Sequence, residues 1–228
     1  SLNTVGESVI FKSTDGDQPF KVTLWVPENT SKKPLPLLAV LDGQRYFNYA
    51  ISMHHMMQDY EWTPPFAILG VDTSQGRWPM LSGQREAILD KLKKQVFPYL
   101  GEKYPISDER ILFGWEAAGG FTLKTMIDKP HLFNSYIAAS PSPLYGKYFP
   151  MLQQEFNNMI ATMTRGAVNK HIFVTLGRYD YPQYLGIDEL KSALDSITTN
   201  KPRYTFTNID DATHSSLGFE SLKRWGHS

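Results

Sequence analysis

Short, mostly apolar runs alternate with longer amphipathic stretches along the chain, and this alternation is the feature that most constrains the fold. Five runs have the composition of strands that are buried on both faces, namely residues 36–41, 66–71, 110–113, 135–139 and 171–176. Three stretches have helical spacing, namely residues 84–104, 188–197 and 216–225. Strands that alternate with helices predict an α/β protein with a mainly parallel central sheet and helices on both faces.

Additional strands are expected near both ends of the chain. Residues 8–12 and 20–26 alternate in strand fashion on either side of a turn-rich connection, which predicts an N-terminal antiparallel hairpin. Residues 203–209 form a more polar strand candidate. Pro98 lies inside the stretch 84–104 and is expected to kink or end that helix. The chain has 228 residues and no linker-like segment, so we expect a single domain over residues 1–228.

Composition limits the chemistry that the chain can perform. Its 23 Lys and Arg balance 23 Asp and Glu, and a net charge of zero argues against a broad footprint for nucleic acid or anionic membrane. The absence of cysteine excludes disulfides, Cys-ligated zinc and thiol nucleophiles. The six histidines show no metal-binding spacing, and nothing points to a cofactor. Catalysis would therefore use oxygen or nitrogen groups.

The sequence leaves the compartment and the assembly open. No window approaches the roughly 18 apolar residues of a membrane-spanning helix. The first residues lack a basic segment followed by an apolar stretch, which fits a cytoplasmic protein or an exported one supplied without its signal. The oligomeric state is not indicated.

Residues 111–123, ILFGWEAAGGFTL, form the most informative segment, because a buried strand runs through small residues into a helix. In α/β-hydrolases this strand-to-helix turn, the nucleophile elbow, holds the catalytic serine. EAAGG at residues 116–120 resembles the ESAGG elbow of carboxylesterases, with Ala117 in place of serine. LDGQRYF at residues 41–47 resembles a family loop that reads LDGxxxF, and residues 128–142 resemble the family's following strand entry. Over residues 5–225 the chain resembles the putative-esterase family of α/β-hydrolases, which includes esterase D, siderophore esterases, feruloyl esterases and mycolyltransferases.

This resemblance implies an α/β-hydrolase fold and a serine-type carboxylic ester hydrolase that acts on a small-molecule ester. If Ala117 marks the nucleophile position, the chain is expected to be inactive, because alanine cannot attack a carbonyl. A second register takes Gly114 as the first glycine of the elbow and puts Glu116 at the nucleophile position. We prefer Ala117, because this register keeps residues 118–120 as the small stretch that faces the strand.

Two explanations of the missing serine are open. An engineered Ser→Ala substitution would leave the remaining machinery in place, whereas a natural, non-catalytic ligand-binding pseudoenzyme would have kept only the pocket. The persistence of the other motifs favours the substituted enzyme. An acyltransferase is a further alternative, because hydrolysis and transfer share the acyl-enzyme step.

The resemblance also implies the partners of the nucleophile. His214 follows the last strand candidate, where the family has its catalytic histidine. Asp180 follows the strand candidate 171–176 and is preferred as the orienting acid over Asp188 or Glu189. The oxyanion hole needs two backbone N–H groups, and these are assigned to Ala118 and Gln44.

Substrate contacts are assigned to side chains that border these motifs. They are Asp42, Arg45, Trp115 and Glu116, and Arg77 is a further candidate for an anionic or hydroxyl-rich substrate group. Residues 141–165 are rich in Tyr, Phe and Met, so they are a candidate cap over an apolar pocket.

Overall fold

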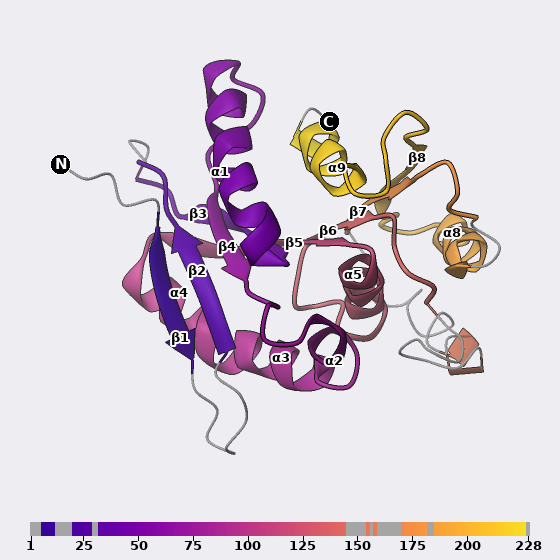
Figure 1. Cartoon of the computed structure of the whole chain (residues 1–228), viewed down its shortest axis with the longest axis horizontal. Coiled ribbons are helices and arrows are strands. Elements are labelled where there is room, and N and C mark those ends of the chain that lie inside the picture. Colours follow the sequence, from indigo (N-terminus) through magenta and orange to yellow (C-terminus); the bar gives the residue numbers. More distant parts are fainter. Residues whose placement is uncertain are drawn as a thin grey trace. The chain divides into compact units, whose positions relative to one another are not determined.

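The computed structural model describes residues 6–11, 20–28, 32–144, 154–155, 157–158, 170–181 and 185–226 (Figure 1). The chain divides into two compact units, which are Ser1–Ile111 with Gly226–Ser228 (unit 1) and Leu112–Trp225 (unit 2). Strand β5 contains residues of both units. The single domain expected from the sequence stays a prediction. No helix in the described ranges is long and apolar enough to cross a bilayer.

Eight strands form one mixed sheet in the order β1-β2-β4-β3-β5-β6-β7-β8. They are β1 (Glu7–Phe11), β2 (Phe20–Trp25), β3 (Leu35–Leu41), β4 (Ala67–Val71), β5 (Ile106–Trp115), β6 (Ser135–Ala139), β7 (His171–Leu176) and β8 (Arg203–Asn208). The pairs β1–β2 and β2–β4 are antiparallel, whereas β3–β4, β6–β7 and β7–β8 are parallel. The predicted α/β class, with its antiparallel N-terminal hairpin, is confirmed.

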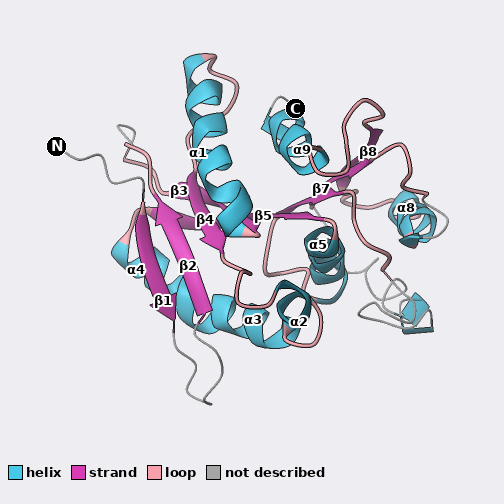
Figure 2. Ribbon diagram, in the orientation of Figure 1, coloured by secondary structure: helices cyan, strands magenta, loops and turns pink. Residues whose placement is uncertain are grey.

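Helices follow β3, β4, β5, β7 and β8 along the chain, as the alternation predicts, and α9 comes after the last strand (Figure 2). They are α1 (Gly43–Asp59), α2 (Arg77–Leu81), α3 (Arg85–Lys91), the π-helical turn η1 (Leu92–Val96), α4 (Phe97–Lys103), α5 (Ala117–Asp128), α8 (Ile187–Asp195) and α9 (Leu217–Gly226).

Strand β2 has a helix on each of its faces in unit 1. Phe20 points to one face, where the Lys91 ammonium of α3 lies 5.8 Å from the centre of the Phe20 ring. Trp25 is five residues further on and therefore points to the other face. Its ring meets the His54 ring of α1 edge-on, with 5.0 Å between the centroids. Unit 1 therefore has the helix–sheet–helix layering expected of an α/β protein.

Helix α5 is the buried helix of unit 2. Every residue from Ala117 to Ile127 is buried, so this helix has no solvent-facing stripe. The hydroxyl groups of Thr122 and Thr125 donate to the carbonyls four residues earlier, at 2.8 and 2.7 Å, which satisfies two polar groups that could not reach water. The apolar run before α5 and the small residues at its start are therefore explained by burial.

Two elements differ from the sequence prediction. The expected helix 84–104 is continuous, but it contains the π-helical turn η1 immediately before α4, where Pro98 occupies the first turn. Proline in a regular helix clashes with the carbonyl four residues earlier, and a wider turn at that point avoids the clash. Strand β5 begins at Ile106, four residues before the predicted start, because the exposed, charged residues Asp108 and Glu109 near its amino end do not have the pattern of a buried strand.

We predict that Gly114→Ala destabilises the protein by roughly 1–3 kcal/mol or more. A Cβ at this position would lie 2.0 Å from the Ala118 carbonyl oxygen and 2.6 Å from the Thr122 hydroxyl oxygen, so the backbone would have to move. The matched control is Gly101→Ala in α4, where a Cβ meets no atom within 4 Å. This control is expected to gain up to about 1 kcal/mol from helix propensity. Urea unfolding followed by circular dichroism measures both changes, and equal stability of the two variants would contradict the close approach.

We also predict that stability falls as the pH drops from about 6.5 to about 4. His54 is buried, and its Nε2 accepts the Phe66 N–H at 3.2 Å. Burial lowers the pKa of His54 from 6.5 to about 4. The unfolded chain therefore takes up the proton first, and roughly 3 kcal/mol, present in full above pH 6.5, is lost across this window.

The free energy of unfolding measured against pH tests this link. His54→Gln should flatten the profile between pH 6.5 and 4, because the titrating group is gone. His55→Gln removes an exposed neighbour and should keep most of the slope, since burial is the larger cause of the His54 shift. A profile that His54→Gln leaves unchanged would assign the pH dependence to other groups.

Candidate active site

Strand β5 passes into helix α5 through a single residue, Glu116. Its backbone has φ 57° and ψ −118°, a conformation that non-glycine residues adopt at a cost of about 1–3 kcal/mol. The Glu116 N–H donates to the Ala139 carbonyl at 2.9 Å, and its carbonyl accepts the Ser142 N–H at 2.9 Å. These bonds to the segment that follows β6 hold the turn in its strained form.

The close approach of Gly114 to α5 determines which residue lies at the tip of this turn. The Ala118 carbonyl leaves no room for a side chain at Gly114. Gly114 therefore fills the place of the first glycine in the elbow, and Glu116 lies at the tip. Ala117 is instead the first residue of α5. This geometry agrees with the second register, through Gly114, and the assignment of the nucleophile position to Ala117 stays a prediction.

The Glu116 carboxylate contacts His214, the predicted catalytic histidine. Glu116 Oε2 lies 2.8 Å from His214 Nε2, and the two side chains are 37% and 57% exposed. The indole N–H of Trp115 donates to the His214 carbonyl at 2.9 Å, and the two rings lie 5.0 Å apart at 47°. Trp115, predicted as a substrate contact, thus holds the His214 segment in place.

A buried serine connects His214 to the predicted acid. The Ser140 hydroxyl donates to Asp180 Oδ2 at 2.6 Å, and its oxygen lies 3.4 Å from His214 Nδ1. Asp180 Oδ2 also accepts the Gly177 N–H at 2.7 Å, which fixes the carboxylate directly after β7. The structure therefore brings Asp180 and His214 together through Ser140. The alternative acids, Asp188 and Glu189, lie in the first turn of α8.

Sequence reasoning missed Ser140. It follows β6, is buried and has a positive φ of 44°, which is uncommon for a serine. The positive φ belongs to the turn at the carboxyl end of the strand. A serine in an SPS run is typical of many turns, and only the coordinates place its hydroxyl between the acid and the histidine.

Helix α5 begins directly after Glu116, and the Glu116 side chain makes no capping hydrogen bond to it. The first N–H groups of a helix have no partner within the helix, and they favour negative charge. The oxyanion role assigned to the Ala118 N–H stays a prediction. Within the described residues, no group of three His, Asp or Glu side chains is placed to hold a metal ion.

Unit 1 contains a second polar cluster, at the start of α1. Asp42 is buried, has φ 55° and precedes the helix. The Arg77 guanidinium donates to both of its carboxylate oxygens, Nε to Oδ1 and Nη2 to Oδ2, at 3.0 Å each, and the Thr73 hydroxyl donates to Oδ1. Asp42, predicted as a substrate contact, therefore has its carboxylate engaged inside the protein. Arg77 forms a bidentate ion pair, which is stronger than a single surface contact.

Gln44 and Arg45 follow Asp42 in α1. The Gln44 amide exchanges two hydrogen bonds with Thr73, at 2.8 Å to the hydroxyl and 3.0 Å from the backbone N–H. The Arg45 guanidinium lies 5.6 Å from the centre of the Tyr46 ring. Burial raises the pKa of Tyr46 to about 12, so this phenol stays neutral. The oxyanion role of the Gln44 N–H and the substrate contact of Arg45 stay predictions.

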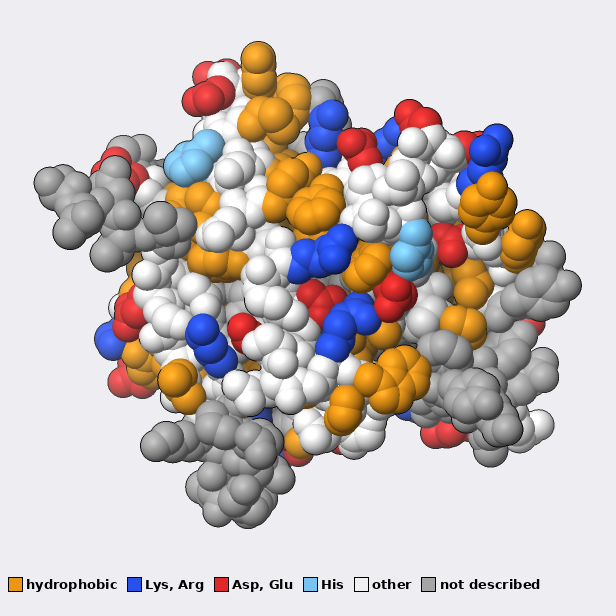
Figure 3. Space-filling model, viewed as in Figure 1, with side chains coloured by type: hydrophobic (Ala, Val, Ile, Leu, Met, Phe, Trp, Pro, Cys, Tyr) orange, Lys and Arg blue, Asp and Glu red, His pale blue; other side chains and the backbone are white. Residues whose placement is uncertain are grey.

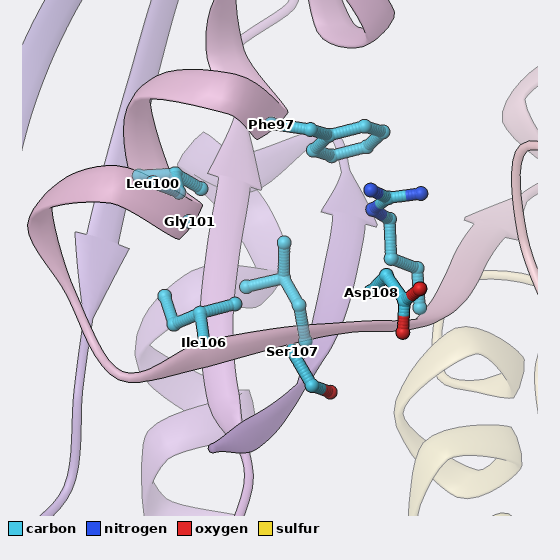
Figure 4. Close-up of a pocket in the computed structure, with 8 residues that line it drawn as sticks. Phe97, Leu100, Gly101, Ile106, Ser107 and Asp108 are labelled. Atoms are coloured by element: carbon cyan, nitrogen blue, oxygen red, sulfur yellow. The ribbon is translucent and has the colours of Figure 1, made fainter.

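A cavity of about 160 Å³ lies at the amino end of β5 (Figure 4). It is lined by Leu37, Phe97, Leu100, Gly101, Ile106, Ser107, Asp108 and Arg110. Ligand sites usually span about 300–1,000 Å³, so this cavity is small for a substrate. The Arg110 guanidinium covers the Phe97 ring at 4.3 Å, and burial lowers its pKa. The elbow is at the other end of this strand, so the cavity takes no part in the site around Glu116.

The surface is mixed in charge. On the face shown in Figure 3, the described basic and acidic side chains are interspersed among apolar ones. Most of the candidate cap, residues 141–165, lies outside the described residues.

We predict that Ser140 and Asp180 are energetically coupled. Ser140→Ala and Asp180→Asn each weaken a bond to a carboxylate, at about 1.5–3 kcal/mol. The double variant should lose less than the sum, with a coupling of roughly 0.5–3 kcal/mol, because both changes remove the same contact. Ser82→Ala, an exposed control whose hydroxyl donates to the Trp78 carbonyl, should stay within about 0.5 kcal/mol. Additive losses in urea unfolding would refute the contact.

Comparisons with known proteins agree with this architecture. Three solved structures superpose on nearly the whole chain: the BES protein from Bacillus cereus (17% identity, 100% of this chain and 95% of that chain, TM-score 0.82), siderophore hydrolase EstB from Aspergillus nidulans (18%, 99% and 95%, 0.79) and an IroE-like serine hydrolase from Shewanella oneidensis (14%, 97% and 79%, 0.77). No curated protein matches the chain. The family model described as Putative esterase matches residues 13–188. The chain therefore belongs to the putative esterase family.

Proposed function

We propose that this chain binds small-molecule esters in the site of an ester hydrolase, and that Glu116 prevents their cleavage through an acyl-enzyme. Family membership supports the ester class. The observation on which the proposal depends is the Glu116 carboxylate, which occupies the tip of the elbow 2.8 Å from His214 Nε2. The site then has the base and the acid of a serine esterase but lacks its nucleophilic hydroxyl.

The elbow motif agrees with this assignment. Its pattern is glycine, any residue, nucleophile, any residue, glycine. Residues 114–118 read GWEAA, so the first glycine is present, Glu116 takes the nucleophile position, and Ala118 replaces the second glycine. Under this proposal the missing hydroxyl belongs at Glu116 rather than at Ala117, because Ala117 begins the helix.

A carboxylate cannot replace the serine hydroxyl in ester cleavage. Attack by a hydroxyl exchanges one ester for another, whereas attack by a carboxylate on an ester carbonyl forms a mixed anhydride. The anhydride is more reactive than the ester from which it came, so it reverts. Loss of the serine nucleophile typically lowers kcat by about 10⁴–10⁶. The same block applies to acyl transfer, because hydrolysis and transfer share the acyl-enzyme step.

The remaining groups have roles that a restored serine could use. His214 would act as the general base and then as the acid, and Asp180 would orient it through Ser140. With the nucleophile position at Glu116, the N–H of the next residue, Ala117, would hold the oxyanion, and Gln44 is the candidate for the second N–H. The bonds from Trp115 and Ser140 hold His214 without any contribution from the Glu116 side chain.

We predict that Glu116→Ser creates an esterase and that Ala117→Ser does not. Both variants gain one hydroxyl at adjacent positions, so they form a matched pair. Glu116→Ser should be labelled by a fluorophosphonate probe and should turn over p-nitrophenyl butyrate at least about 10²-fold faster than the unsubstituted chain. Adding His214→Ala should abolish both gains. The unsubstituted chain should bind the intact ester saturably, as followed by NMR of the His214 ring, without releasing nitrophenol.

Three results would overturn the proposal. Labelling of Ala117→Ser but not of Glu116→Ser would restore the other register. A burst of nitrophenol from the unsubstituted chain would show that acyl-enzyme chemistry operates without a serine at the tip. Lack of any saturable change on titration with short p-nitrophenyl esters would remove the ester site.

A further inference from the structure

The carboxylate at the tip of the elbow has a chemistry of its own. We propose that Glu116 is a nucleophile toward saturated carbon, and that the chain hydrolyses alkyl electrophiles with an anionic leaving group, such as alkyl halides or alkyl sulfonates. This activity goes beyond the proposed function, which concerns acyl substrates, and it does not depend on ester binding.

Three features of the turn support a reactive carboxylate. The strained backbone at Glu116 is held by hydrogen bonds on both sides, although a glutamate gains nothing locally from this conformation. The side chain is 37% exposed, so a ligand can reach it. Glu116 immediately precedes α5, a helix of 12 residues, and its Oε2 lies 2.8 Å from His214 Nε2.

A carboxylate can displace a leaving group from saturated carbon, whereas its attack on an ester carbonyl gives an anhydride that reverts. A lone pair of a Glu116 carboxylate oxygen forms the new C–O bond, while the electron pair of the carbon–leaving group bond departs with the halide or sulfonate. The product is an alkyl ester of Glu116, which is far less reactive than an anhydride. No proton donor is needed in this step, because the leaving group departs as a stable anion.

The second step returns the enzyme to its starting state. Water attacks the carbonyl carbon of the Glu116 ester, and His214 Nε2 takes the proton. The tetrahedral intermediate expels the alkoxide, which receives that proton from His214. The Glu116 carboxylate is restored with one oxygen atom from water. In sum, one alkyl halide and one water give one alcohol, one proton and one halide ion.

Before alkylation, His214 Nε2–H donates to the ionised Glu116 carboxylate at 2.8 Å, so the second step requires the other tautomer of His214. The base must be Nε2, so the proton must reside on Nδ1. The Ser140 hydroxyl directs its own proton to Asp180 Oδ2 at 2.6 Å, so its lone pairs are available to Nδ1–H at 3.4 Å. Alkylation of Glu116 removes the negative charge that faces Nε2, which leaves this nitrogen free to bind water. The same network therefore serves both steps.

The test follows the alkyl group and the oxygen atoms. The chain is incubated with 1-iodobutane in ¹⁸O-labelled water, iodide and butanol are quantified, and the peptide that contains Glu116 is examined by mass spectrometry. Repeated turnover should place ¹⁸O in the Glu116 carboxylate. His214→Ala, or His214→Gln if the first variant does not fold, should instead accumulate one butyl group on Glu116, because only the second step needs the base.

Matched glutamate variants complete the test. Glu116→Gln keeps the shape of the side chain and should lower iodide release by roughly 10³-fold or more. Glu86→Gln alters a more exposed glutamate in the first turn of α3 and should react like the unsubstituted chain. The proposal is overturned if no butyl group appears in the His214 variants, if alkylation is unchanged by Glu116→Gln, or if butanol forms without ¹⁸O in Glu116. None of these results depends on the esterase activity of Glu116→Ser, so the two proposals fail separately.

Discussion

The site depends on one steric constraint, which is the contact between strand β5 and the first turn of helix α5. The Ala118 carbonyl lies so close to Gly114 that even a methyl group would not fit between them. The chain must therefore reverse within one residue, and that residue is Glu116, with its positive φ. Backbone bonds to Ala139 and Ser142 fix the turn from the neighbouring segment. The position of the carboxylate follows from the packing of small residues rather than from its own preferences.

His214 explains how a chain of an esterase family can carry a glutamate, rather than a serine, at the tip of the turn. The hydrogen bonds of His214 on the side of Ser140 and Asp180 are those that a general base requires, whatever group faces its other nitrogen. Serine at the tip would use this base to attack a carbonyl. Glutamate at the tip keeps the base and changes the electrophile that it can serve. Under the two proposals, a glutamate at the tip would redirect the chemistry while the fold and His214 are retained.

The sequence predicts most of the fold, because strands that are buried on both faces consist of nearly continuous apolar residues. The strands 135–139 and 171–176 agree residue for residue with β6 and β7. The sequence also points to His214 and Asp180, which lie on either side of Ser140 in the structure, and their catalytic roles stay predictions. It offers two registers of the elbow, and the preference for Ala117 rests only on the small residues 118–120. Only the torsion angles of Glu116 and the space around Gly114 distinguish them. Ser140 is missed for a related reason, since its role depends on a turn with positive φ that no local pattern marks.

The central claim is that Glu116, rather than Ala117, lies at the tip of the elbow and faces His214. A crystal structure of the chain tests this claim most directly, through the backbone torsions at these two residues. We expect φ near 57° and ψ near −118° at Glu116, helical torsions at Ala117, and 2.8 Å between Glu116 Oε2 and His214 Nε2. A positive φ at Ala117, with Glu116 extended at the end of β5, would contradict the account.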